Sequence, residues 1–455
     1  MLASVFERFV QQSPVSVMVR GLMERIFAPE ALDELFETVA QQQYTRELLF
    51  SSVVNLMSLV VCAFYPSVNA AYRAKAKELN VSRASVYNKL NGIEPEVSAA
   101  IVRQSVEKLI NVTHQMGKQF PPLVKGYRTR ILDGTCLAAT DHRLKALRPY
   151  AAKTMPGKCL VVLDPELQLA INVFPCEDGH SQERALFPQV LETVQAEELW
   201  LADRNMCTLG FLFGLHNRQA AFLIREHKTL PWQAMSELKE IGETETGQVW
   251  EQMIAISKDG QSLQLRRVIV KLFKPTRDGE TEIAILTTLP LEAASALQVA
   301  ELYRQRWSVE TLFQTVTTNF EGEIQTLGYP QAALFSFCLA LVAYNILSVV
   351  RSALGSVHGS EEVKSGLSDF YVVNEVQRTY GGMMIAIEPT HWQVFATCSQ
   401  LELVQILQHL SAQVHLKSFL KQPRSPKKKK PPLIVDGKHR HLSTARLLKQ
   451  DTMSP

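Results

Sequence analysis

The sequence predicts an α/β core that carries a β-strand insertion and is flanked by helical regions on both sides. Three features of the 455 residues support this architecture. Apolar residues recur at helical spacing in the first part of the chain, strand-like runs begin near residue 125, and apolar helical stretches return after Leu291. Apolar residues make up 46% and charged residues 20%, a balance that is typical of a globular protein.

These changes in pattern define six segments, and the length suits about two to four domains. The expected boundaries are 1–118 for an all-helical domain, 119–228 for the first part of the core, 229–292 for the β insertion, 293–352 for the last part of the core, 353–422 for a helical C-terminal region and 423–455 for a basic tail.

Within the helical domain, residues 71–90 are similar to a helix-turn-helix. Asn80-Val81 is the expected turn, and Ser82 is a suitable cap for the second helix. Arg83 and Lys89 then lie on the helix that contacts DNA in such motifs. An ordinary helical hairpin with a polar face also explains the pattern.

In the core, two predicted strands bring an aspartate to a strand end. Three β-rich runs indicate an antiparallel meander, and two further strands alternate with helices, which gives an α/β order. The first run, 128–139, contains Asp133, and the fourth, 198–203, ends in Asp203. Sites in such sheets gather where strands end. Each aspartate taken alone is more often a turn or helix-capping residue.

A third acidic residue lies on a predicted helix after the insertion. Tyr303, Arg306 and Glu310 are spaced i, i+3 and i+7, which places them on one helical face. Three carboxylates from two strand ends and a helix can hold a pair of Mg²⁺ or Mn²⁺ ions, the equipment for phosphodiester chemistry. The simpler alternatives are an ion pair between Arg306 and Glu310, and half-buried packing of Tyr303.

The charge of the chain is unevenly distributed. From Lys417 onward, eleven Lys and Arg stand against two Asp, a net charge of +9, while residues 1–416 carry −6. The run that includes Lys427 and Lys428 suggests a polyanionic partner and salt-dependent affinity for DNA. A solvated tail that aids solubility is the alternative.

Other features exclude some classes of protein. Seven scattered cysteines without a CxxC pair indicate free thiols rather than a zinc site. Two apolar stretches, 48–65 and 334–350, are interrupted by polar residues and are expected to be core helices, so we expect no membrane partner. The N-terminus lacks a signal pattern, and we expect a cytoplasmic, nucleoid-associated protein.

Asp133-Gly-Thr, Asp203, and the set of Tyr303, Arg306 and Glu310 resemble the DDE transposases of the insertion-sequence type 4 family. The signature of that family is Tyr, two residues, Arg, three residues, Glu, six residues, Lys. The chain departs from it at the last position, which is Thr317.

Three further segments, 141–148, 177–184 and 343–347, are also similar to the family, and the resemblance covers about 125–350. It implies a ribonuclease-H-like core in which Asp133 and Asp203, with Glu310, bind two metal ions and catalyse cleavage.

The resemblance further implies cut-and-paste transposition at terminal inverted repeats by a protein that is at least a homodimer in its synaptic complex. Arg306 and Tyr303 would contact DNA phosphates. In relatives that form hairpins, a flipped-out base needs an aromatic platform, for which Trp250 is one candidate and Trp232 another; a core tryptophan is the alternative.

Arg266 and Lys271 in the insertion would follow a DNA backbone, although charges on exposed strands also discourage edge pairing. Two other functions compete with transposition: a DNA nuclease of the same fold, which cuts without joining, and a catalytically decayed DNA-binding protein.

Overall fold

The N-terminal part of the chain is helical up to Gln115, as the spacing of its apolar residues predicts. The structure is a computed structural model that describes residues 2–43, 47–116, 121–138, 144–145, 155–276 and 279–422. Residues Met1–Leu420 form one unit, and Lys421–Pro455 form a second. The described N-terminal elements are η1 (Ser4–Phe6), α1 (Glu7–Gln12), α2 (Pro14–Ile26), α3 (Pro29–Val39), α4 (Phe50–Val61), α5 (Val68–Leu79), α6 (Arg83–Leu90) and α7 (Pro95–Gln115).

The segment similar to a helix-turn-helix consists of α5 and α6, joined by a tight turn. Asn80 takes a left-handed conformation with φ 49°, which ends α5. The Ser82 side chain accepts a hydrogen bond from the backbone N–H of Ser85 and caps α6, as predicted. The Tyr72 hydroxyl donates to the Val81 carbonyl at 2.9 Å and ties the turn to α5. The local geometry fits the motif, while its DNA contacts stay a prediction.

Within the described residues, ten strands form one mixed sheet. Its strands are β1 (Arg128–Cys136), β2 (Lys158–Asp164), β3 (Leu169–Cys176), β4 (Glu198–Ala202), β5 (Ala221–Arg225), β6 (Gln233–Ala234), β7 (Lys239–Glu243), β8 (Gly247–Lys258), β9 (Gln261–Leu272) and β10 (Glu282–Thr287). The order is β3-β2-β1-β4-β5-β10-β9-β8-β6, and β7 also pairs with β8. The predicted antiparallel meander is present in β1, β2 and β3, whereas β1, β4 and β5 run parallel.

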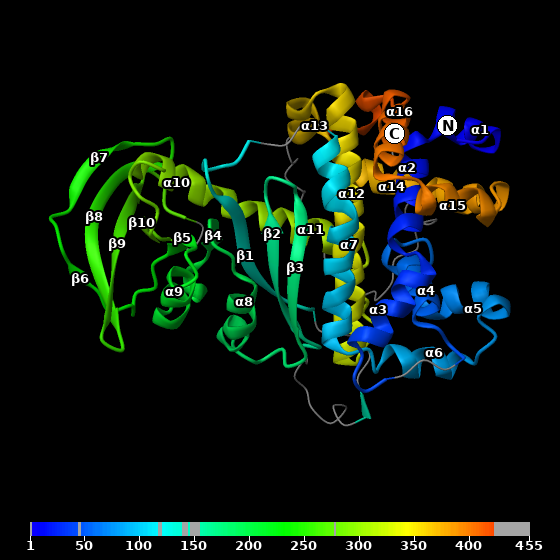
Figure 1. Ribbon diagram of the computed structural model, residues 1–455, viewed down its shortest axis with the longest axis horizontal. Helices are drawn as coiled ribbons and strands as arrows, with labels where there is room; N and C mark the ends of the chain where they lie inside the picture. Colours follow the sequence, from blue (N-terminus) through cyan, green and yellow to red (C-terminus); the bar gives the residue numbers. More distant parts are fainter. Residues whose placement is uncertain are drawn as a thin grey trace, which may run out of the picture. The chain divides into compact units, whose positions relative to one another are not determined.

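The central strands are buried on both faces. In β1, Ile131 packs into one apolar core and Leu132 into the other, because successive side chains point to opposite faces. The Leu132 face is covered by α8 (Phe187–Thr193) and α9 (Leu209–His216), which follow the 3-10 turns η3 (Glu183–Leu186) and η4 (Arg204–Met206). The Ile131 face packs against the helices after the insertion and the N-terminal helices (Figure 1).

A buried ion network holds the three central strands together. Arg130 on β1 donates to Asp164 on β2 at 2.5 Å and to Glu198 on β4 at 2.9 Å. The indole N–H of Trp200 donates to the second oxygen of Glu198. Because these charges are paired, their burial is tolerated, and the network fixes the alignment of β1 with β4 three residues before Asp133.

The β insertion extends the sheet rather than forming a separate one, since β10 pairs with β5. The predicted hairpin turn at Asp259-Gly260 joins β8 and β9, and both residues have positive φ. The second predicted turn includes Asp278, which lies outside the described residues. The short strands β6 and β7 were not predicted, because their exposed residues lack an alternating pattern.

The Tyr303–Glu310 segment is not one continuous helix, as the spacing had suggested. α10 (Ala296–Arg304) ends after Tyr303, a 3-10 turn η5 (Gln305–Trp307) follows, and α11 (Ser308–Thr318) then begins. No Gly or Pro marks this change in the sequence.

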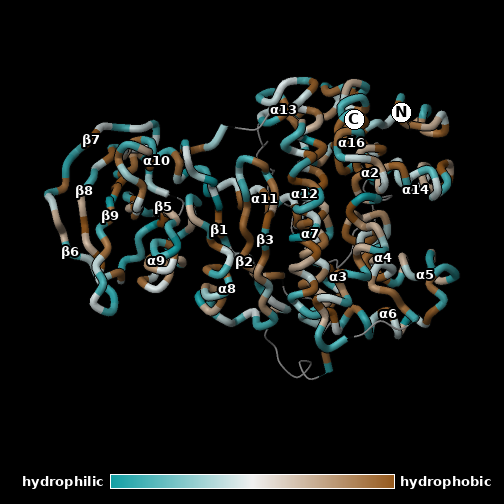
Figure 2. Tube along the Cα trace, in the orientation of Figure 1, coloured by the Kyte–Doolittle hydropathy of each residue, from teal (hydrophilic) through white to brown (hydrophobic). Residues whose placement is uncertain are grey.

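The apolar stretch after the signature segment forms the core helix α12 (Pro330–His358). Among the described residues it alone is long and apolar enough to cross a membrane, yet its most apolar stretch is completely buried in the protein (Figure 2). Buried Asn345 covers the free edge of β3: its side chain accepts from the Ala170 N–H at 2.8 Å and donates to the Ala170 carbonyl at 3.0 Å. These contacts support the prediction of a core helix.

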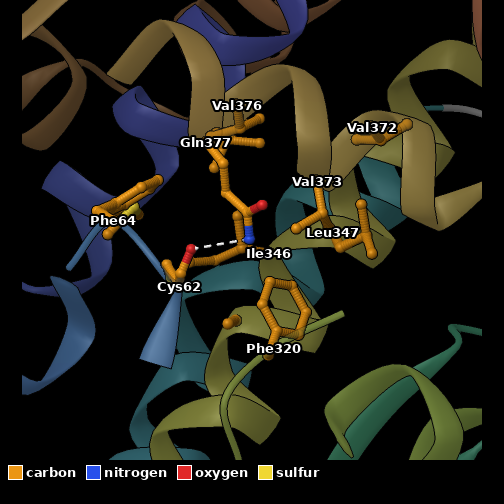
Figure 3. A pocket seen from close by; sticks show the side chains of 12 residues that line it. Cys62, Phe64, Phe320, Ile346, Leu347, Val372, Val373, Val376 and Gln377 are labelled. Atoms are coloured by element: carbon orange, nitrogen blue, oxygen red, sulfur yellow. Dashed lines mark hydrogen bonds between the residues drawn. The ribbon is translucent and has the colours of Figure 1, made fainter. Parts of the chain in front are cut away.

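The C-terminal region is helical, as predicted. Its elements are α13 (Ser360–Gly366), α14 (Asp369–Ala386), α15 (Pro389–Thr397), α16 (Gln400–Ala412) and η6 (Leu416–Phe419). A cavity of about 30 Å³ separates α14 from α12 and is lined mainly by apolar side chains (Figure 3). The Gln377 side chain donates to the Cys62 carbonyl at 3.2 Å beside it. The lining offers too few polar partners to hold a water, so the cavity is a packing defect.

Candidate active site

Two of the predicted catalytic carboxylates come from adjacent strands. Asp203 directly follows the end of β4, as predicted, whereas Asp133 lies within β1, which continues to Cys136 and leaves only its pairing with β4 at this point. β1 and β4 pair in parallel, and Leu132 lies opposite Ala202 at their last paired position. One further step along each strand reaches Asp133 and Asp203. Neighbouring strands are about 4.8 Å apart, so the sheet itself brings these two residues together.

Both aspartates face the helices that follow the insertion. Ile131 and Leu201, two residues earlier on their strands, pack into the core on that side of the sheet. Side chains two residues apart point to the same face. Glu310 is in the first turn of α11, whose buried residues belong to the same core. The structure therefore places Asp133, Asp203 and Glu310 on the same side of the sheet.

Arg306 bridges two of these carboxylates. Its Nη1 donates to Asp133 Oδ2 at 2.8 Å, and its Nη2 donates to Glu310 Oε1 at 3.4 Å. The Arg306 side chain is only 12% exposed, whereas that of Glu310 is 47% exposed. The predicted ion pair with Glu310 is thus present, and the shorter bond to Asp133 was not predicted. The guanidinium occupies the position of a cation between the first and third carboxylates.

Tyr303 is buried behind Arg306 and is 6% exposed. Burial raises the pKa of its hydroxyl above the ordinary value, and the charge of nearby Arg306 opposes that shift. In this structure Tyr303 is therefore a packed side chain, as the simpler alternative expects. Contact with a DNA phosphate would require its hydroxyl to become accessible.

The environment of Asp133 disfavours its charged form. Burial raises the pKa of Asp133 to about 6, and the negative charges of Asp203 and Glu183 add to this shift. Arg306 and the backbone N–H of Gly134 act in the opposite direction. A carboxyl group with a raised pKa among other acids is a frequent mark of a functional site.

Asp203 lies beside Asp133, as predicted for a catalytic residue, and it also caps a helical turn, which was the alternative explanation for it. Its Oδ1 accepts from the backbone N–H of Asn205 at 2.8 Å and caps η4. This bond fixes one carboxylate oxygen, and among the described residues the other has no hydrogen-bond partner.

Glu183 is a fourth acidic residue near the site that the sequence did not single out. It opens η3, and a Cβ placed on Gly134 would lie 2.2 Å from its Oε1. Two features of the sequence could have pointed to Glu183: the segment 177–184, which is similar to the family, and the glycine directly after Asp133.

The donor atoms suit a hard divalent cation, since all are carboxylate oxygens. Arg306 already supplies a positive charge between Asp133 and Glu310, which shows that the site accepts a cation there. Among the residues that the structure describes, no group of three Asp, Glu, His or Cys side chains lies close enough together to hold a metal ion. Metal binding by this set therefore requires Arg306 to leave its present bonds.

A groove of about 920 Å³ adjoins the carboxylates, between the insertion and the α10–α11 segment. Its lining includes Arg225 and Lys274 as well as Arg306. Two aromatic side chains in the lining, Phe273 and Trp307, are 57% and 59% exposed, and the Arg306 guanidinium lies over one face of the Trp307 ring, 5.3 Å from its centroid. Cations and exposed aromatic rings in one groove are the combination that binds single-stranded nucleic acid.

Two residues predicted to bind DNA lie on α6, in the N-terminal helical region and not on the strands and helices that carry the carboxylates. Arg83 is exposed and donates to the Asn69 side chain at 3.1 Å. The Lys89 ammonium lies over the Phe36 ring, 3.9 Å from its centroid. Arg83 is thus accessible to a ligand, while Lys89 is partly engaged with α3.

The structure gives two of the three predicted DNA contacts of the insertion other roles. Arg266 is 7% exposed; it pairs with Glu251 at 2.7 Å and donates to two carbonyls before α10. The Trp250 ring is half-buried beneath Lys271, whose Nζ lies 4.1 Å from its centroid. These contacts favour the structural alternatives for Arg266 and Trp250, and only Lys271 remains exposed.

The other candidate platform, Trp232, is 38% exposed, but Arg267 lies over its ring and its indole N–H donates to Glu226. Thr317, at the lysine position of the signature, is exposed and donates to the Phe313 carbonyl. Lys427, Lys428 and most of the 141–148 segment lie outside the described residues.

One family model matches the part of the chain that contains this site. Residues 124–346 match a family model described as "Transposase DDE domain". That range contains Asp133, Asp203 and Glu310 together with the groove. No match was found among curated proteins. Residues 124–346 of the chain are therefore a transposase DDE domain, the catalytic domain of a family of enzymes that carry out phosphoryl transfer on DNA.

Proposed function

We propose that the protein is a cut-and-paste transposase of the insertion-sequence type 4 kind, with a ribonuclease-H-like core that cleaves and joins DNA at terminal inverted repeats. The observation that supports the proposal is the position of Arg306, which is bound between Asp133 and Glu310, while Asp203 follows the strand that pairs with β1.

The three carboxylates would hold two Mg²⁺ or Mn²⁺ ions. When bound, such ions sharpen an attacking water or 3′-hydroxyl and steady the leaving oxygen. Asp133 and Asp203 are suited to orient these groups because the parallel pairing of β1 and β4 fixes their backbones. Glu310, on a helix and half exposed, can adjust to the DNA.

Arg306 couples DNA to this arrangement. A DNA phosphate beside the groove offers its guanidinium a new partner, and arginine binds phosphate with paired hydrogen bonds. Release from Asp133 and Glu310 then frees two carboxylates for metal. Binding of DNA is thus expected to strengthen binding of metal, and by linkage the reverse.

The remaining parts of the chain suit the other steps of transposition. α6, with exposed Arg83, would recognise the terminal repeats, and the basic tail with Lys427 and Lys428 would add sequence-independent affinity. Phe273 and Trp307 would stack on bases exposed near the cleavage point. Two ends must be paired, so a homodimer is proposed for the synaptic complex, in the cytoplasm and on the nucleoid.

The test is an assay with DNA that carries both flanking ends of the element. Wild-type protein with Mg²⁺ is expected to release the ends and join them to a target, while Asp133→Asn, Asp203→Asn and Glu310→Gln bind the ends without cutting. Strand transfer with precleaved ends separates a transposase from a nuclease. Wild-type cutting by any of the three variants refutes the assignment.

A further inference from the structure

Two arginine side chains at the groove converge on one carboxylate. Arg204 Nη1 donates to Glu280 Oε1 at 2.8 Å, and Arg225 Nη2 donates to Glu280 Oε2 at 2.5 Å. We propose that Arg225, with Arg204 beside it, binds a phosphate of the DNA strand that enters the active site, and that Glu280 occupies this phosphate position in the DNA-free protein. The inference rests on the proposed function and adds a DNA contact that neither the signature nor the carboxylate trio includes.

The sheet places Arg225 next to the second aspartate. β4 and β5 pair in parallel, and Ala202 lies opposite Ile224 at their last paired position. One further step along each strand reaches Asp203 and Arg225, and neighbouring strands are about 4.8 Å apart. Because β4 lies between β1 and β5, Asp133, Asp203 and Arg225 follow one another on three adjacent strands.

Arg225 is also on the same side of the sheet as the two aspartates. Leu223, two residues earlier on β5, packs into the core that contains Leu201, which precedes Asp203 by two residues. Burial is the main cause of the raised pKa of Tyr303, and the charges of Arg225 and Asp203 also act on it, which agrees with this placement. A positive charge therefore lies beside Asp203, where a phosphate of the bound strand has to be held.

The arrangement around Glu280 is that of an anion site. Arginine binds carboxylate and phosphate with the same fork of N–H donors, so a carboxylate held by two guanidinium groups occupies a position that suits a phosphate. Each carboxylate oxygen of Glu280 accepts from a different arginine. The hydrogen bond from Arg225 lowers the pKa of Glu280, which is therefore a charged carboxylate at neutral pH.

A phosphate can reach this position from the groove. Arg225 and Glu280 both belong to its lining, together with Lys274 and Arg306. The Arg204 side chain is 46% exposed and the Glu280 side chain 24%. Glu280 precedes β10, so the exchange of its carboxylate for a phosphate leaves the pairing of β10 with β5 intact.

The simpler explanation is that Glu280 only ties the insertion to the core through two ion pairs. A tie of this kind contributes to stability and not to DNA affinity. Loss of the Glu280 charge would then lower the melting temperature and leave DNA binding unchanged, whereas the proposal requires DNA binding to become stronger.

The first test measures the binding of terminal DNA to the full chain by fluorescence anisotropy, in EDTA and at several salt concentrations. Arg225→Gln should reduce the slope of log affinity against log salt concentration by about one, and Arg225→Lys, which keeps the charge, should retain the wild-type slope. Arg218→Gln is the matched control, since Arg218 is exposed and precedes the opposite end of β5. An unchanged slope in Arg225→Gln would overturn the proposal.

The second test concerns the charge of Glu280. Glu280→Gln keeps the shape of the side chain and removes its charge, so it should strengthen DNA binding about fivefold or more. Glu282→Gln, which removes an equal charge from an exposed position two residues along the chain, should stay near the wild-type affinity. Glu280→Gln should give a smaller gain in the Arg225→Gln background, because one of the two guanidinium groups that it releases is then missing. An equal gain in both backgrounds, or a gain in neither, would contradict the proposal.

These tests are separate from those of the proposed function, because no metal is present and no strand is cut. If wild-type protein cuts and joins the ends in Mg²⁺ while Arg225→Gln keeps the wild-type slope, only the phosphate site is wrong. If wild-type protein neither prefers the ends over unrelated DNA nor cuts them, the proposed function fails, and the phosphate site with it.

Discussion

Replacement of Asp133 by asparagine is expected to stabilise the metal-free protein at neutral pH. The pKa of Asp133 is about 6 in the folded protein, against an ordinary value of 3.8. Between these pH values the folded protein holds a proton that the unfolded chain has released, so stability falls as the pH rises through this window. Above about pH 6, Asp133 is ionised in the folded protein, and the full destabilisation by its buried charge is present.

The size of the effect follows from the shift in pKa. A shift of about two units corresponds to roughly 3 kcal/mol, and Asp133 is only 16% exposed, so solvent screens little of it. Asparagine has the same shape and no charge, and it avoids this cost. With an unfolding entropy of about 2.1 cal/mol/K per residue over Met1–Leu420, the melting temperature should rise by about 3 °C.

Differential scanning calorimetry in EDTA at pH 7.5 and pH 3.5 measures this effect. Asp133→Asn should melt higher than the wild type at pH 7.5, and the difference should disappear at pH 3.5. Asp259→Asn is the control, because Asp259 is 82% exposed in a hairpin turn. Added Mg²⁺ should stabilise the wild type and not Asp133→Asn. Equal melting at pH 7.5, or a difference that does not depend on pH, refutes the reasoning.

Three further outcomes are expected. Arg306→Gln should reduce the slope of log affinity against log salt concentration by about one for terminal DNA, because one phosphate contact is lost. Fluorescence anisotropy titrations at several salt concentrations measure this slope. An unchanged slope would show that Arg306 does not contact a phosphate. Phe273→Ala and Trp307→Ala should each weaken DNA binding by about 1–3 kcal/mol if a base stacks there, with unchanged melting; wild-type affinity in the same assay would exclude stacking. Asn345→Ala should cost at least about 2 kcal/mol in urea denaturation, since it leaves two backbone groups of Ala170 unpaired, and a smaller loss would mean that water replaces the amide.

The sequence was most informative where local pattern and topology agree. Apolar, strand-like runs that lead to Asp133 and Asp203 predicted both strands, and the parallel pairing of β1 with β4 then determines their proximity. The coarse order of helical region, α/β core with insertion and helical region is confirmed by the ten-stranded sheet and its flanking helices.

Contacts between residues that are distant in the sequence could not be predicted from such local patterns. Arg306 and Asp133 are 173 positions apart, and nothing in either local segment specifies that pair. For the same reason Arg266 looked like a free cation on an exposed strand, although Glu251 on the neighbouring strand and two carbonyls bind it. Charge composition cannot distinguish a solvated arginine from one that is paired and buried.

Aromatic residues show the same limit. Trp250 was chosen for its ring, but Lys271 covers it, whereas Phe273 and Trp307 prove to be the exposed aromatic residues of the groove. Exposure depends on which neighbours pack above a ring, and a single sequence does not record them. Glu183 was not singled out for a related reason: its position near the site is visible only when Gly134 is seen beside it.

The most direct test of the account is the position of Mn²⁺ in crystals of the protein bound to terminal DNA, located by anomalous scattering at the manganese edge. We expect peaks within ligand distance of Asp133 and Asp203, with Glu310 at the same ions and Arg306 turned to a phosphate. Manganese bound elsewhere, with Arg306 still between Asp133 and Glu310 in the presence of DNA, would contradict it.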